Sequence, residues 1–212
     1  MAISAKQRQK KLERKAKKRK QLLAKKNVGI SLLKSKAASY SDQPIYECLV
    51  PDGLFEIGLG NVIVSRKAPK GNIAVSAFVV DVFCLGVKNA LFRVLSEFDY
   101  DTLKTSLMAS HEDQAFESIH PACARKLLEG AVAYAEELGF SCHPDYVNAK
   151  GIFGDIDPSS CPVRYTYGKD GKPFYIRGPN ESMAEAQKII NQLYQRCGEG
   201  GFDYLMMTDE GF

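Results

Sequence analysis

Three aspartates are the residues whose types and spacing best suit metal chemistry. Asp155 and Asp157 lie two residues apart, so both carboxylates of an extended segment face the same side. Such oxygens are typical ligands of divalent cations. Asp81 lies in an otherwise apolar segment, and together with this pair it outlines a two-metal nuclease or phosphodiesterase site. The competing interpretation is structural, with Asp157 starting a turn and Asp81 ending a strand beside Lys88 or a backbone donor, and it is the stronger one.

Two Cys/His pairs offer the ligand types of zinc: His120 with Cys123, and Cys142 with His143. If residues 121–138 form one helix, its ends lie about 27 Å apart at a rise of about 1.5 Å per residue. One ion cannot join the two pairs across that distance, and each pair alone has too few ligands. The sequence therefore predicts structural thiols, surface histidines, and neither a bound metal nor a cofactor.

The chain has six cysteines and no Cys-x-x-Cys pair. Cys84 is a candidate nucleophile if a histidine lies beside it, but it continues an apolar segment, which favours a packing role. The amino terminus lacks the apolar stretch of a secretory signal, so we expect reduced thiols rather than a disulfide framework. No run of about 18 apolar residues indicates a membrane span. A cytoplasmic protein is expected.

The strongest functional signal is the cationic stretch "KQRQKKLERKAKKRKQ" at residues 6–21. Residues 1–36 carry 14 Lys or Arg and one Glu, a net charge of +13, whereas the other 176 residues carry 15 Lys or Arg and 24 Asp or Glu, a net charge of −9. Ten of these cations form what we call the polybasic arm: Lys6, Arg8, Lys10, Lys11, Arg14, Lys15, Lys17, Lys18, Arg19 and Lys20. Its repelling charges and missing apolar stripe predict a disordered or frayed segment that becomes helical on an anionic surface.

Clustered Lys and Arg side chains bind phosphate backbones by releasing counterions, and this binding needs no fixed fold. No aromatic residue is interleaved for base stacking, so the predicted contact is independent of sequence, with RNA or the ribosome as partner. A solvated tail and an anionic lipid surface are weaker alternatives, because a lipid-binding helix needs an apolar side. The acidic remainder either projects away from the nucleic acid or presents its surface to a protein partner.

The remaining sequence predicts elements that alternate between strands and helices. Strands are expected at 45–50 and in a hairpin of 61–67 and 72–84, the second arm of which is apolar enough to lie inside a sheet. A second hairpin is expected over 163–178, with Asp170 and Gly171 in the turn. The Ser-rich segment 31–44 indicates a linker.

Helical spacing of apolar residues favours a helix over 85–98, and another is expected after Asp99 or Asp101. The clearest helix covers 121–138, with Pro121 at its first position and Gly139 just past its end. A capping box of Ser182 and Glu185 begins one more helix, which stops at Gly198.

Four segments resemble those of a group of uncharacterised bacterial proteins. Those proteins carry a Val-Asp-x-x-Cys-Leu-Gly-Val-Lys segment, a downstream helix ending in Gly-Phe, a His-x-Asp segment and a Gly-Lys-x-Gly-Lys-Pro stretch. The matching pieces here are Val80 to Lys88, Gly139-Phe140, His143 to Asp145 and Gly168 to Pro173. The resemblance spans most of residues 54–178 and implies a bacterial, cytoplasmic source, and it carries over no catalytic residue.

These observations together predict a basic arm and linker at 1–36, followed by a single α+β domain at 37–212. The domain is expected to contain an antiparallel sheet built from hairpins, with three or four helices packed on one side. A non-catalytic factor tethered to RNA or the ribosome is the favoured function. A metal-dependent nuclease using Asp81, Asp155 and Asp157, and a protein-interaction module with an incidental basic tail, are the alternatives.

Overall fold

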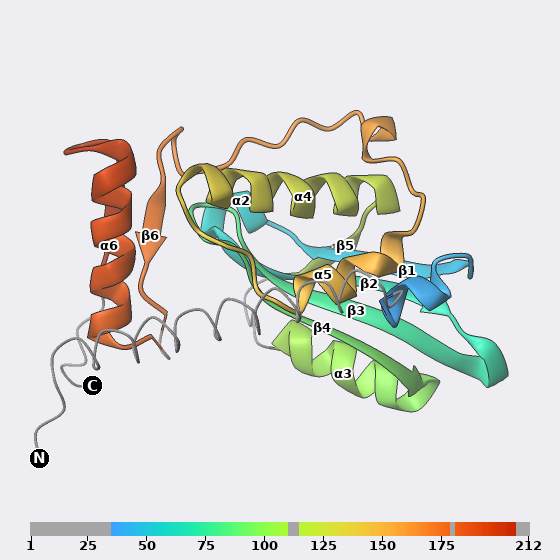
Figure 1. The fold of residues 1–212 in the computed structure, drawn as a ribbon. Coiled ribbons are helices and arrows are strands. Elements are labelled where there is room, and N and C mark those ends of the chain that lie inside the picture. Colours follow the sequence, from blue (N-terminus) through green and yellow to red (C-terminus); the bar gives the residue numbers. More distant parts are fainter. Residues whose placement is uncertain (1–34, 110–114, 179–180, 207–212) are drawn as a thin grey trace, which may run out of the picture. The chain divides into compact units, whose positions relative to one another are not determined.

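The computed structural model describes residues 35–109, 115–178 and 181–206, and Lys36–Phe212 cluster into one compact unit. Five strands form a sheet in the order β4-β3-β2-β1-β5, with antiparallel neighbours throughout (Figure 1). They are β1 (Ile45–Pro51), β2 (Leu59–Lys67), β3 (Asn72–Asp81), β4 (Gly86–Ser96) and β5 (Phe116–Ser118). The sheet and its packed helices confirm the predicted α+β class.

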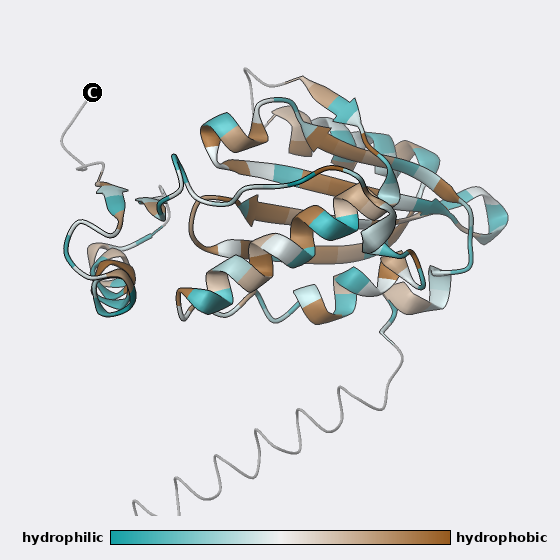
Figure 2. Cartoon of the chain, turned by 90° about the horizontal axis from the view of Figure 1, so that it is seen from above, coloured by the Kyte–Doolittle hydropathy of each residue, from teal (hydrophilic) through white to brown (hydrophobic). Residues whose placement is uncertain are grey.

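The main core lies between one face of this sheet and the helix α4 (Pro121–Glu137). Val62 and Val64 of β2 and Phe78 of β3 point into it, because residues two apart share a face of a strand. The short helices α2 (Leu54–Ile57) and α5 (Tyr146–Ala149) complete this layer. Figure 2 shows the hydrophobic colour concentrated on the strands that the helices cover.

The opposite face of the sheet is covered by α3 (Glu97–Ala109) (Figure 1). Ile63 of β2 and Val75 of β3, which alternate with the residues of the main core, pack there with Tyr100 of α3. The prediction that all helices lie on one side of the sheet was therefore wrong. The reason is that β2 and β3 carry apolar residues on both faces of the strand, so neither face can be left in water.

The predicted hairpin of 61–67 and 72–84 is confirmed by β2 and β3, and β3 is paired on both sides. The helix expected over 85–98 is wrong, because residues 86–96 form β4 and pair with β3 over its whole length. Apolar residues of β4 pack on both faces of the strand. Their positions in the sequence therefore resemble the spacing of apolar residues in a helix. Pairing with β3 decided in favour of the strand over the helix.

Helix ends follow the local signals closely. Helix α4 begins at Pro121 with His120 as its cap, and α6 (Met183–Cys197) begins with the predicted capping box and ends before Gly198. The helix expected after Asp99 or Asp101 is confirmed as α3, but it starts at Glu97. Ser96 accepts a hydrogen bond from the backbone N–H of Asp99, which provides the earlier cap.

The C-terminal segment forms a strand–helix–strand unit instead of the predicted second hairpin. Strand β6 (Phe174–Ile176) pairs in parallel with β7 (Asp203–Leu205), and α6 connects them. The tight turn at Asp170 and Gly171 does form, with positive φ angles of 52° and 79°, but it closes only the bridge of Lys169 with Lys172. Helix α6 and β6 pack beyond the carboxyl end of α4 through a second apolar cluster around Tyr175 and Leu193 (Figure 1).

Residues 36–44 are part of the folded body and not of the predicted linker. Ala37, in the short 3-10 helix η1 (Ala37–Tyr40), is fully buried. The backbone carbonyl of Gln43 accepts a hydrogen bond from the buried Arg66. Four further short elements join this unit: the 3-10 turns η2 (Pro69–Gly71), η3 (Lys150–Phe153) and η4 (Pro158–Ser160), and α5. Among the described residues, no helix is both long and apolar enough to cross a bilayer.

Candidate functional site

The ten cations of the polybasic arm, Lys6 to Lys20, lie outside the described residues. The other predicted site residues are described and can be placed. They fall into two groups, the acidic residues and the cysteines and histidines. The structure also has a pocket that the sequence did not indicate.

Asp81 ends β3 and holds the turn that leads into β4. Its Oδ1 accepts hydrogen bonds of 2.9 Å from the backbone N–H groups of both Phe83 and Cys84. The side chain is buried, and burial raises the pKa of Asp81 to about 6, while the charge of Lys88 and the backbone hydrogen bonds act in the opposite direction. Asp81 therefore has the structural role that the sequence favoured.

Asp155 and Asp157 lie on the loop beside the amino-terminal half of α4. Asp157 caps η4, because its carboxylate accepts hydrogen bonds from the backbone N–H and the hydroxyl of Ser159. These hydrogen bonds lower the pKa of Asp157. The structure does not join this pair to Asp81. Within the described ranges, no three His, Cys, Asp or Glu side chains are grouped so that they could hold a metal ion.

The strand pair of Asp81 and the loop of Asp155 and Asp157 contact α4 at different residues. Gly86, paired with Asp81, lies so close to the helix that an added Cβ would be 2.8 Å from the carbonyl oxygen of Ala131. Arg125 holds the loop that carries Asp155 and Asp157, because its guanidinium donates hydrogen bonds to the backbone carbonyls of Gly154 and Ile156. Arg125 and Ala131 are six positions apart along the helix, a rise of about 9 Å.

The raised pKa of Asp81 predicts that this residue makes the protein less stable as the pH rises. Between about pH 4 and pH 6 the folded state binds more protons at Asp81 than the unfolded state, so its contribution to the free energy of unfolding should fall by about 2–3 kcal/mol. Asp81→Asn keeps an oxygen acceptor for both N–H groups and does not ionise. Chemical denaturation from pH 4 to pH 7 should show the variant gaining stability relative to the wild type. Parallel profiles would contradict this, and Asp157→Asn is the control.

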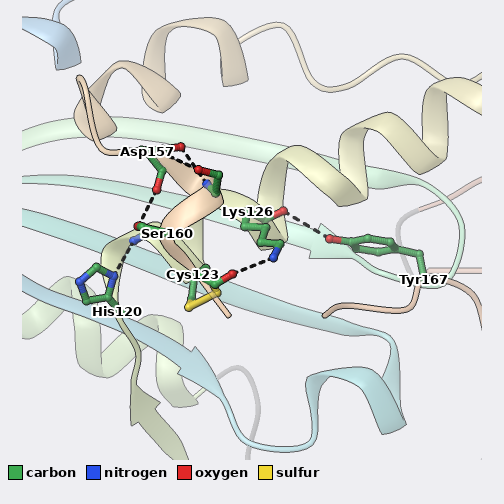
Figure 3. Close-up of a disulfide and its surroundings, with 9 residues drawn as sticks. His120, Cys123, Lys126, Asp157, Ser160 and Tyr167 are labelled. Carbon is green, nitrogen blue, oxygen red and sulfur yellow. Dashed lines mark hydrogen bonds between the residues drawn. A yellow bond between two sulfur atoms is a disulfide. The ribbon is translucent and has the colours of Figure 1, made fainter. Parts of the chain in front are cut away.

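The cysteine prediction was wrong for one pair, because Cys123 of α4 and Cys161 form a disulfide (Figure 3). Cys123 therefore has no thiolate to offer zinc, and Cys142 and His143 remain a separate pair. The two cysteines are 38 residues apart in the sequence, so nothing local indicated their approach. Cys48, Cys84, Cys142 and Cys197 are free thiols. Cys84 is fully buried, and burial raises its pKa, as expected for a packing role.

A set of contacts, which we call the clamp, holds residues 154–161 along α4, and the disulfide is one of these contacts. Lys126 donates a hydrogen bond of 2.8 Å to the carbonyl of Cys161, and the hydroxyl of Ser160 donates to the carbonyl of Asp157 (Figure 3). Downstream of the clamp, the hydroxyl of Tyr167 donates to the carbonyl of Leu127. Residues 161–167 therefore run along α4 as an irregular strap, and not as the strand that the sequence predicted.

Removing the disulfide should lower the free energy of unfolding by about 2–4 kcal/mol, because a cross-link over 38 residues restricts the unfolded chain. The double variant Cys123→Ala/Cys161→Ala avoids an unpaired thiol. Urea unfolding with and without a reductant checks the expectation, and only the wild type should respond to the reductant. Six titratable thiols in the denatured, unreduced wild type would contradict the disulfide itself.

A pocket with a volume of about 360 Å³ opens beside the amino end of α4. One wall is the end of β1 and the helix α2, and the opposite wall is the strap after Cys161. The floor is formed by Ile119, Cys123 and Leu127. Phe55 of α2 stacks on Tyr165 of the strap, with ring centroids 5.5 Å apart and planes 6° apart. Cys123 lines the pocket, so the disulfide attaches the strap wall directly to the floor.

The charged groups of this pocket are acidic. Glu56 and Glu117 line it, and both side chains are exposed at its mouth. Burial raises the pKa of Tyr165, and the negative charge of Glu117 adds to the effect. His120 also lines the pocket, and its Nδ1 accepts a hydrogen bond of 3.2 Å from the backbone N–H of Ala122.

Sequence reasoning missed this pocket because its residues come from four separate segments, 50–56, 117–120, 123–127 and 163–165. No motif spans them. The nearest sequence feature is Pro51-Asp52-Gly53 at the end of β1, a turn-forming triplet that does not indicate a cavity.

Comparisons with known proteins identify no relatives: no family model matches the chain, no curated protein matches its sequence, and no solved structure matches its fold.

Proposed function

We propose that this chain is a non-catalytic bacterial factor of the cytoplasm that associates with RNA or the ribosome through its polybasic arm. The observation that supports the proposal is the division of charge, with +13 on residues 1–36 and −9 on the remainder. A polyanion is attracted to the first part and repelled by the second. The arm, and not the folded body, is therefore the nucleic-acid-binding part.

The positions of the acidic residues support a non-catalytic body. Asp81 holds the turn after β3, and Asp157 caps η4, so each carboxylate already has backbone or hydroxyl donors. These hydrogen bonds account for the presence of Asp81 and Asp157 at their positions without a role in metal binding. The nuclease alternative needs Asp81 and Asp157 at one ion, yet Asp81 is engaged in the turn after β3 and Asp157 in η4.

The disulfide is compatible with a cytoplasmic location because both of its cysteines are buried. Cys161 is 2% exposed and Cys123 is 7% exposed. Exchange requires a thiolate to reach one of the sulfur atoms, and the small exposure limits this access to the pocket that Cys123 lines. We expect the folded protein to keep the bond in a reducing compartment and the unfolded chain to lose it.

The test replaces the ten arm cations by glutamine in the full-length chain, which we call the arm-neutralised variant. The matched control replaces three exposed cations of the body, Lys67, Lys70 and Arg164, by glutamine. Tagged wild type and control should co-sediment with ribosomes or bind RNA at low salt, and the arm-neutralised variant should not. Equal binding by all three would remove the proposal and favour an interaction module with an incidental tail.

The same preparations decide on the nuclease alternative. A Mg²⁺-dependent cleavage of RNA by the wild type, abolished by Asp155→Asn/Asp157→Asn, would overturn the non-catalytic assignment. Unchanged RNA binding by that variant, with no cleavage by either protein, is the expected result.

A further inference from the structure

We propose that the pocket between α2, the amino end of α4 and the strap after Cys161 is a binding site for a small organic cation, namely an amine or guanidinium carried on an apolar body. This inference goes beyond the proposed RNA association and does not depend on it. It rests on the described residues of the body, whereas RNA association rests on the arm.

The shape and lining of the pocket suit an apolar body. Its volume of about 360 Å³ is at the lower end of the range of about 300–1,000 Å³ for small-molecule sites. Leu54, Ile119 and Leu127 line it with aliphatic surface, and Val163 is 45% exposed at its edge. Phe55 and Tyr165, which stack on each other, add aromatic surface to the lining. A ligand that enters therefore exchanges water for aliphatic and aromatic contacts.

The charge of the lining selects a cation. Glu56 and Glu117 are the acids among the pocket residues, and no Lys or Arg lines it. An ammonium or guanidinium placed over an aromatic face is also attracted by the negative face of the ring. An anion would meet two carboxylates and no Lys or Arg.

The walls are held in place before any ligand binds. Phe55 and Tyr165 belong to opposite walls, and their stacking joins α2 to the strap. The disulfide attaches the strap to α4 only two residues before Val163 and four before Tyr165. A site whose walls are fixed in advance loses less conformational freedom on binding, which favours affinity.

Three matched probes separate charge from shape: 2-phenylethylammonium, 2-phenylethanol and 3-phenylpropanoate. Each has one phenyl ring on a two-carbon chain, and they differ in the charge at the end of that chain. In NMR titrations of the full-length protein, we expect the ammonium to bind with a Kd in the range of about 1–10 mM, typical of so small a ligand. The alcohol should bind about three- to tenfold more weakly, and the carboxylate should not bind detectably. Equal or tighter binding of the carboxylate would overturn the proposal.

Variants then locate the binding. Glu56→Gln/Glu117→Gln should remove the preference for the ammonium over the alcohol while leaving the binding of the alcohol unchanged, and both side chains are exposed, so the fold should tolerate the change. Glu137→Gln, an exposed glutamate near the other end of α4, is the matched control and should keep the full preference. A preference that survives the double substitution would contradict the assigned site.

The arm-neutralised variant distinguishes two sources of the cation. If the natural ligand is a free amine, this variant and the wild type should bind 2-phenylethylammonium equally. If a basic side chain of the arm occupies the pocket, the variant should bind the probe more tightly. Both outcomes support the cation site, and neither affects whether the arm binds RNA, which is measured separately by co-sedimentation.

Discussion

The affinity of the full chain for RNA should fall by about 10³- to 10⁵-fold when the salt concentration rises from about 50 to about 200 mM, if six to ten phosphates are neutralised. Each Lys or Arg that pairs with a phosphate releases condensed counterions, so the loss depends on the number of pairs. The polybasic arm has ten cations within fifteen residues, 6–20, enough for that number. Fluorescence anisotropy of labelled RNA over a series of salt concentrations measures the slope.

The slope also shows which part of the chain makes the contact. The control variant with Lys67, Lys70 and Arg164 replaced should keep the slope of the wild type, and the arm-neutralised variant should lose affinity at every salt concentration. Because no aromatic residue is interleaved in the arm, RNAs of different sequence should give the same slope. A flat salt dependence, or an unchanged slope after arm neutralisation, would show that another surface binds the RNA.

Arg66→Met should lower the free energy of unfolding by about 3–5 kcal/mol, the largest effect that we expect from one substitution in the body. Arg66 is 5% exposed, and its guanidinium donates to three backbone carbonyls, those of Gln43, Ile152 and Phe153. Methionine fills a similar volume but donates no hydrogen bond, so three buried or half-buried acceptors would lose their donor. Chemical denaturation measures the loss.

Two comparisons separate this effect from a general loss of charge. Arg93→Met, at an exposed position of the edge strand β4, should change the free energy of unfolding by less than about 0.5 kcal/mol. Arg66 also joins residues 36–44 to η3, so its replacement should make the backbone of that segment exchange hydrogen faster. Equal stability of Arg66→Met and the wild type would show that water replaces the guanidinium without cost.

Elements with local signals were predicted accurately from the sequence. Pro121 and the capping box of Ser182 and Glu185 placed the starts of α4 and α6, because caps depend on residues within one turn of each other. The turn of Asp170 and Gly171 formed for the same reason. The division of charge that supports the RNA proposal is likewise a property of the sequence itself.

Errors arose where partners far apart in the chain decided the outcome. Residues 86–96 satisfied a helical pattern, but pairing with β3 made them a strand. Residues 163–167 satisfied a strand pattern, yet Tyr165 and Tyr167 packed on α2 and α4, and β6 found its partner in β7. Periodicity describes the faces of a segment without saying what covers them.

The sequence by itself determined the class of the fold, the ends of the main helices and the cationic amino-terminal segment, because each depends on composition or on neighbours within a few residues. The tertiary structure decided that Cys123 pairs with Cys161, that Arg66 holds residues 36–44, and that Glu56, Glu117 and the Phe55–Tyr165 stack surround one pocket. These contacts join segments that lie tens of residues apart. Only the packing of strands and helices around a shared core brings such segments together, and no local pattern records it.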